Sequence, residues 1–160
     1  MKLTIHRGTR EIGGNCIEIQ SRGRRIFFDL GITLVDPGGG RFGLGGGNGT
    51  SGRELLDTGT LPRISGVYQW DALDESVEGI VLSHAHLDHY GFACHLHEGI
   101  RRYMGEGTRR LIEITGLLSG AGLLTTCCPC LTEKSCQYNL SRVRTGDATV
   151  EAQVGNFIIP

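Results

Sequence analysis

The sequence predicts an α/β layered fold on three observations: an early β-hairpin, a later apolar strand that runs into a short helix, and a last strand followed by a longer helix. The expected strands are short apolar or alternating runs bounded by glycine or charged residues. They are Lys2–His6, Asn15–Gln20, Arg24–Leu30, Gly79–Ser83 and Arg102–Met104, with residues 21–23 as the hairpin turn. Thr108 is expected to cap a helix that runs to about Leu118. Residues 119–144 show no clear period and are left unassigned.

Length and charge limit the function classes. At 160 residues the chain has the size of one domain. Its 16 Lys plus Arg against 17 Asp plus Glu give no overall electrostatic attraction toward nucleic acid. Residues 1–7 lack the apolar core of a signal peptide, and no apolar run is long enough to span a membrane. We therefore expect a cytoplasmic protein with reduced thiols and no membrane partner.

Glycine is unusually frequent, with 26 residues, and many of these lie in a run that we expect to form a flexible loop over residues 37–52. No Gly-Lys-Ser/Thr follows it and no helix pattern opens there, which excludes a phosphate-binding P-loop. A plain linker is favoured over a lid at the rim of an active site.

The most informative segment for function is His84-Ala85-His86-Leu87-Asp88-His89, which follows the apolar strand directly. Imidazole and carboxylate groups suit zinc and similar divalent ions, and the end of a strand can hold them in fixed directions. His84 and His86 are two residues apart, so in an extended stretch they point the same way and can share one ion. Asp88 and His89 are expected to turn toward a second ion. The segment therefore predicts a metal site with four candidate ligands.

The H-x-H-x-D-H pattern resembles the signature of metallo-β-lactamase-fold hydrolases. Residues 10–19 and 26–31 are similar to the opening hairpin of the branch that holds ribonuclease J and the β-CASP RNA-processing exonucleases. The similarity covers most of residues 1–115. It implies that residues 1–118 form the N-terminal half of an αββα sandwich and that residues 119–160 are a divergent continuation.

The resemblance also implies a chemistry. Members of this family bind two zinc ions, and a metal-bound hydroxide hydrolyses a phosphodiester or a related ester. Carried over to this chain, His84 and His86 match the ligands of the first ion, and Asp88 and His89 those of the second. Asp88 matches the catalytic residue that handles the proton, and Asp29 matches a structural aspartate that supports the metal loop. The implied function is metal-dependent RNA hydrolysis, with RNA as the partner.

The sequence departs from the family pattern in its second half. The family uses three further ligands, two of them histidines, yet no histidine follows His97. Asp147 is the only later aspartate, and it precedes a stretch, 147–160, that resembles the paired strands before the family's second metal motif. We therefore expect an N-terminal fragment that ends before that motif. The alternative function is a catalytically incomplete chain that binds metal weakly and has no activity alone.

Other candidate residues are given structural interpretations. His6, His95 and His97 are expected to be structural or solvated, the last two on the helix after the motif. Cys16 and Cys94 are expected to be buried thiols. Redox or zinc chemistry at Cys127, Cys128, Cys130 and Cys136 is disfavoured, because no second C-x-x-C occurs. Two arginine clusters, Arg22/Arg24/Arg25 and Arg101/Arg102/Arg109/Arg110, suit phosphate but are read as solvated charges. The substrate remains open between RNA, DNA and a small ester, and the metal and the oligomeric state remain open too.

Overall fold

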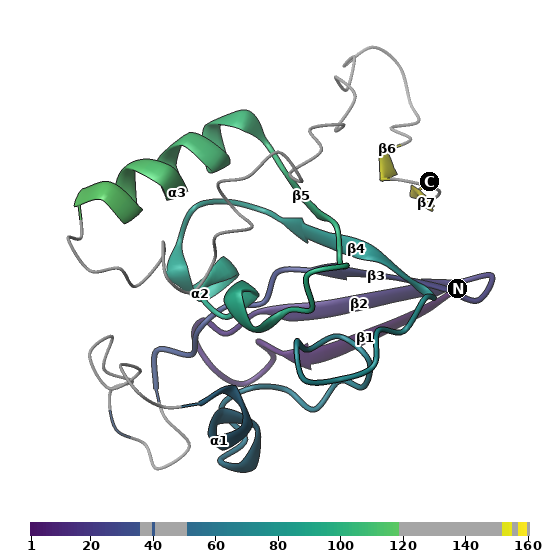
Figure 1. Cartoon of the computed structure of the whole chain (residues 1–160), viewed down its shortest axis with the longest axis horizontal. Coiled ribbons are helices and arrows are strands. Elements are labelled where there is room, and N and C mark those ends of the chain that lie inside the picture. Colours follow the sequence, from purple (N-terminus) through teal and green to yellow (C-terminus); the bar gives the residue numbers. More distant parts are fainter. Residues whose placement is uncertain (36–39, 41–50, 119–151, 155–156, 160) are drawn as a thin grey trace.

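The computed structural model describes residues 1–35, 40, 51–118, 152–154 and 157–159 (Figure 1). Most of the expected glycine loop and all four cysteines after residue 120 lie outside these residues, as do the unassigned region and Asp147. Ser51 and Gly52, which were assigned to the loop, belong instead to the start of a helix. The expected loop therefore extended two residues too far.

A five-stranded mixed sheet forms the centre of the fold, in the order β1-β2-β3-β4-β5 (Figure 1). The first three strands pair antiparallel, whereas β3, β4 and β5 run parallel to one another. The strands are β1 (Lys2–Arg7), β2 (Cys16–Ser21), β3 (Arg24–Phe28), β4 (Val77–Leu82) and β5 (Arg102–Met104). This confirms the α/β class and every strand predicted over these residues, to within two residues at each end.

The ends of two strands differ from the prediction for a local reason. β3 was expected to reach Leu30 but stops at Phe28, because Asp29 has a φ of 60° and leaves the extended conformation. β4 begins at Val77 and ends at Leu82, so Ser83 lies in the loop that follows. The parallel pairing of Phe28 with Val81 brings these two strand ends to the same edge of the sheet.

The helices are less well predicted than the strands. The sequence analysis missed α1 (Gly52–Asp57), although a complete capping box between Ser51 and Glu54 starts it. α3 (Glu106–Leu118) begins before Thr108, which therefore lies in the first turn and is not the cap. After α2 (Leu87–Tyr90) comes only a short 3₁₀ turn, η1 (Ala93–His95). His97 thus lies outside any helix, contrary to expectation.

The core lies mainly on one face of the sheet. There, Phe27, Ile80 and Leu82 pack with residues of the segments that follow β3 and β4 and of α3. On the opposite face Ile26, Val81 and Tyr103 are buried. Cys16 is buried as expected, whereas Cys94 is only half-buried. No helix in the described residues is long and apolar enough to cross a membrane.

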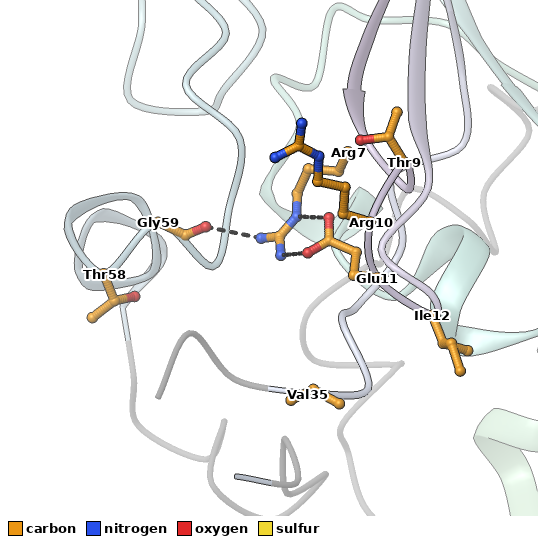
Figure 2. Close-up of a pocket in the computed structure, with 8 residues that line it drawn as sticks. All are labelled: Arg7, Thr9, Arg10, Glu11, Ile12, Val35, Thr58 and Gly59. Carbon is orange, nitrogen blue, oxygen red and sulfur yellow. Dashed lines mark hydrogen bonds and ion pairs between the residues drawn. The ribbon is translucent and has the colours of Figure 1, made fainter. Parts of the chain in front are cut away.

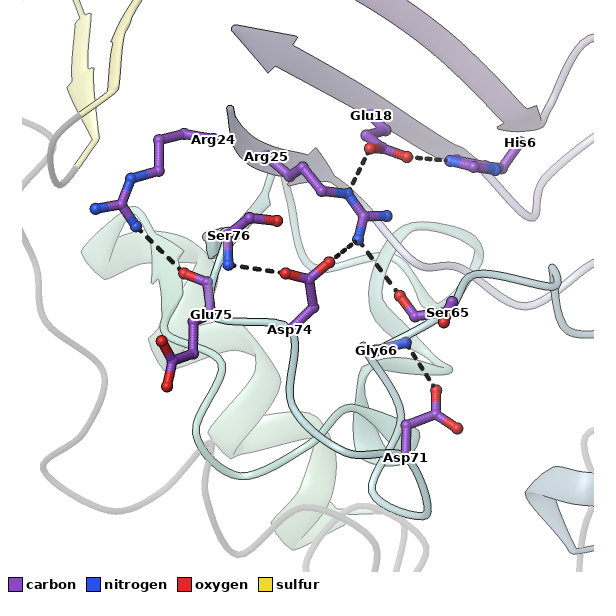
Figure 3. Close-up of polar contacts among 10 residues, drawn as sticks. All are labelled: His6, Glu18, Arg24, Arg25, Ser65, Gly66, Asp71, Asp74, Glu75 and Ser76. Atoms are coloured by element: carbon purple, nitrogen blue, oxygen red, sulfur yellow. Dashed lines mark hydrogen bonds and ion pairs between the residues drawn. The ribbon is translucent and has the colours of Figure 1, made fainter. Parts of the chain in front are cut away.

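Arg25 ties the sheet to the segment that precedes β4 (Figure 3). Its guanidinium lies 2.7 Å from Glu18 and 2.9 Å from Asp74, and Glu18 in turn contacts His6 at 2.7 Å. Burial opposes ionisation of Glu18, but the bonds from Arg25 and His6 outweigh it and lower its pKa. Arg25 is thus a structural ion-pair partner and not a solvated charge.

At the C-terminal end, β6 (Ala152–Val154) and β7 (Phe157–Ile159) pair antiparallel. The sequence analysis expected paired strands in this stretch, and the pairing confirms them.

Replacing Gly31 with alanine is predicted to destabilise the fold, because an added Cβ would lie 1.5 Å from the carbonyl oxygen of Asp88. Neither backbone can move away without breaking the strand-end contacts, so we expect a loss of about 3 kcal/mol in the free energy of unfolding. Urea unfolding measures it. The matched control is Gly107→Ala, where the Cβ meets nothing within 4 Å and helix propensity favours alanine. Equal unfolding midpoints for the two variants would contradict the close approach at Gly31.

Asp74→Asn is predicted to reduce stability in a pH-dependent way. Hydrogen bonds from Ser76, and then the contact with Arg25, lower the pKa of Asp74. Because folding lowers the pKa of Asp74, its carboxylate stabilises the folded state at pH values above its unfolded-state pKa of about 4. This contribution to the free energy of unfolding is lost as the pH falls through the folded-state pKa. The difference between wild type and variant should therefore be at most about 1 kcal/mol at pH 7, since water screens the pairing, and should vanish toward pH 2. Glu75→Gln, an exposed neighbour, is the control for thermal unfolding across this pH range.

Candidate metal centre

The candidate ligands lie in the loop between β4 and α2, at the edge of the sheet where the parallel strands end. Backbone hydrogen bonds from neighbouring segments fix this loop. Leu30 N donates to His89 O at 2.9 Å, Ile32 N donates to Leu87 O at 3.0 Å, and Asn15 N donates to Asp88 O at 3.3 Å. The loop that carries the candidate ligands is therefore held in position by two other segments, one at residue 15 and one at residues 30–32.

Asp29 connects the end of β3 to this loop through its side chain. Its carboxylate accepts hydrogen bonds from Ser83 N and Ser83 Oγ, both at 2.8 Å. The same carboxylate lies 2.7 Å from His89 Nδ1 and is only 7% exposed. These contacts confirm the expectation that Asp29 supports the loop.

The hydrogen bonds assign a proton to two of the histidine rings. Ser83 gives its single hydroxyl proton to Asp29, so at 3.0 Å its oxygen accepts from His84 Nδ1. His89 donates from Nδ1 to Asp29 in the same way. In both rings Nε2 is then unprotonated, as in histidines that bind metal ions, and it faces His86 Nδ1 in His84 and the Asn15 side-chain amide in His89. The tautomers follow from this network and not from observed hydrogens.

The four candidate ligands form two pairs. His84 Nε2 lies 3.0 Å from His86 Nδ1, and His89 Nε2 lies 3.6 Å from Asp88 Oδ2. Two ligand atoms on one tetrahedral zinc ion, each about 2.1 Å from it, are separated by about 3.4 Å. Both separations are close to this value, and the rings of His84 and His89 also lie 3.9 Å apart between centroids, so the assignment of ligands to two ions stays a prediction. The donor atoms therefore fit zinc in type and in spacing.

Each pair supplies two ligands, whereas catalytic zinc sites use three protein ligands and structural sites use four. Within the described residues, no set of three or more histidine, cysteine, aspartate or glutamate side chains is arranged to hold an ion. His6 pairs with Glu18, His95 lies against Trp70, and His97 Nδ1 accepts from Gly99 N. Their structural interpretation is confirmed. Burial raises the pKa of Cys16 to about 12, so its thiol stays protonated at neutral pH.

Sequence reasoning missed two residues of this site. Ser83 joins Asp29 to His84, and the Asn15 side-chain amide lies 3.3 Å from His89 Nε2. The position of Ser83 between the strand and the first histidine was a signal that could have been used. Asn15 offered none, because 74 residues separate it from His89.

The chain is 27% identical over 89 residues to an RNase J-like protein of Methanocaldococcus jannaschii, a match that covers 56% of this chain and 14% of that protein. This chain is thus a distant homologue of β-CASP proteins with the metallo-β-lactamase fold. It is also 28% identical over 96 residues to the transcription termination factor FttA of Methanothermobacter thermautotrophicus, covering 60% of this chain and 12% of FttA. No protein-family model matches the chain.

The chain is also similar in fold to a solved structure. The crystal structure of a protein of unknown function from Enterococcus faecalis superposes with a TM-score of 0.54 and 25% sequence identity. The match covers 70% of this chain and 27% of that one. All three matches therefore span a small part of the relative, between 12% and 27% of its length.

Asp29→Asn is predicted to weaken zinc binding about 10- to 100-fold, because the amide no longer accepts strongly from His89 and Ser83. Asparagine tolerates the positive φ of this position, so the backbone should be kept. Competition titration against a chromogenic chelator measures the affinity, and circular dichroism checks the fold. Asp57→Asn, an exposed aspartate of α1, is the matched control and should bind as wild type does. An Asp29→Asn protein with wild-type affinity would show that the carboxylate does not orient the ligands.

Proposed function

We propose that the site serves metal-dependent hydrolysis of RNA phosphodiester bonds, with zinc as the metal. The observation that carries this proposal is the gathering of four candidate ligands beside a buried carboxylate, with Nε2 of His84 and of His89 left unprotonated. The relationship to an RNase J-like protein supports the choice of nuclease chemistry. In this proposal the described sheet corresponds to the N-terminal half of an αββα sandwich.

His84 and His86 would hold one ion, and Asp88 and His89 the other. When bound, such ions act as Lewis acids and lower the pKa of water to about 7. Groups of the chain itself orient the ligands, hold the loop and accept a proton. Asp29 and Ser83 orient the two histidine rings, and the backbone bonds to residues 15, 30 and 32 hold the loop rigid. The Asp88 carboxylate is 26% exposed in its side chain, so it can receive a proton from a substrate water and pass it to solvent.

One observation favours the second candidate function, a metal-binding chain that does not turn over alone. Each ligand pair has no third protein ligand within the described residues, so each ion would be held by two groups. Two-ligand binding is weak, and no described carboxylate bridges the two positions. We infer that the chain binds zinc through this motif and that its turnover without further ligands is very low.

The test measures zinc binding and hydrolysis on the same protein. His84→Ala is predicted to lower the zinc content, because it removes half of the pair that would hold the first ion and leaves Asp88 and His89 in place. His97→Ala removes a histidine outside the site and should have no effect. Inductively coupled plasma mass spectrometry gives the zinc content, and a 5′-labelled single-stranded RNA reports cleavage.

The outcomes separate the two candidates. Slow zinc-dependent cleavage that His84→Ala eliminates supports the hydrolase. Zinc binding that depends on His84 without cleavage supports the metal-binding chain. Zinc content that is equal in wild type, His84→Ala and His97→Ala contradicts both.

A further inference from the structure

A cavity of about 720 Å³ opens beside the metal loop and has no role in the site described above (Figure 2). The loop between β1 and β2 forms one wall, and the C-terminal end of α1 forms another. Two arginines, one carboxylate, two threonines and two apolar side chains line it, together with Gly59. These residues are Arg7, Arg10, Glu11, Thr9, Thr58, Ile12 and Val35.

Arg7 and Glu11 form the fixed floor of this cavity. The Arg7 guanidinium donates to both oxygens of Glu11, at 3.0 and 2.8 Å, and to Gly59 O at 2.9 Å. The bond from Arg7 also lowers the pKa of Glu11, so the carboxylate is charged and cancels the charge of Arg7. The pair therefore contributes structure to the cavity and little net charge.

Arg10 is the remaining cation of the lining. It is exposed, and within the part of the chain that the structure describes it makes no hydrogen bond or ion pair. Its guanidinium lies apart from the Arg7–Glu11 pair in Figure 2. Among the described lining residues the net charge is thus positive and comes from the Arg10 guanidinium. A guanidinium of this kind binds phosphate oxygens through two parallel N–H donors.

The cavity adjoins the metal loop through Gly13. A Cβ added at Gly13 would lie 2.9 Å from the Asp88 Cβ, so the segment at Gly13 directly contacts the metal loop there. Ile12, the residue before Gly13, is 76% exposed at the cavity wall. Leu34 N donates to Ile12 O at 3.4 Å, which places Val35 on the same side. Exposed aliphatic side chains beside a cation offer a nonpolar surface that a base can cover while the cation holds its phosphate.

We propose that this cavity binds single-stranded RNA beside the metal loop, with Arg10 holding a backbone phosphate and with Ile12 and Val35 packing against a base. The choice of RNA rests on the proposed function. The phosphate contact rests on the free guanidinium and on the charge of the lining. The site would hold the strand outside the metal loop, so Arg10 is a binding residue and takes no part in the chemistry.

Fluorescence anisotropy of a labelled single-stranded RNA of roughly ten nucleotides tests this, in EDTA so that neither metal binding nor cleavage contributes. Arg10→Ala is predicted to weaken binding about tenfold at low salt, since one charged hydrogen-bonded contact is lost. The slope of log K against log salt should fall by about 0.7, the value for one phosphate contact on a single strand. Arg10→Lys should keep the slope and recover part of the affinity, because the charge stays and the fork is lost.

The matched control is Arg101→Ala, an exposed arginine directly before β5, at the opposite end of the parallel strands from the metal loop. It should bind RNA as wild type does. The proposal is overturned if Arg10→Ala retains the wild-type affinity and slope, if it weakens binding no more than Arg101→Ala, or if wild type binds inorganic phosphate but no RNA.

Failure here is distinguishable from failure of the proposed function. If His84→Ala loses zinc while Arg10→Ala leaves RNA binding unchanged, the RNA assignment of the cavity falls and the metal site stands. If zinc binding is absent but RNA binding depends on Arg10, the hydrolase proposal falls and the cavity assignment stands.

Discussion

The buried carboxylate of Asp29 is the interaction on which the site depends. It joins the end of β3 to the loop after β4 through three contacts of 2.7 to 2.8 Å. The positive φ of Asp29 ends β3 early and turns the chain so that these contacts can form. Without the carboxylate, Ser83 N and the His89 ring would lose charge-assisted bonds in a largely buried place. One residue therefore sets the strand end, the loop position and the direction of two imidazole rings.

Close backbone packing also holds the metal loop in position. Gly31 and Gly13 lie against Asp88, where a side chain would clash, and the bonds from residues 15, 30 and 32 hold the loop on both sides. The ligand atoms are then fixed by three segments of chain, which limits the reorganisation needed to bind an ion. The same packing places the arginine-lined cavity next to the loop. The proposed metal site and the proposed anion site would share one rigid support in this way.

The arginines of this chain differ in role although its net charge is only −1. Arg25 forms ion pairs with Glu18 and Asp74, and Arg7 forms an ion pair with Glu11. The charges of both arginines are therefore balanced by carboxylates within the fold. Arg10 has no such partner among the described residues and remains available to an anion. The overall charge balance therefore hides a local cation beside the candidate metal loop.

The sequence by itself determined the five strands of the sheet and the four candidate ligands, because strand periodicity and ligand spacing are local properties of the chain. The prediction missed α1, although Ser51 and Glu54 are a local signal, and it placed the start of α3 three residues late. Only the tertiary structure decided that Asn15 and Ser83 contact the imidazoles, that His84 and His89 both present Nε2, and that Arg7 is paired while Arg10 is not. These facts depend on contacts between segments up to 74 residues apart, and no local pattern encodes such contacts.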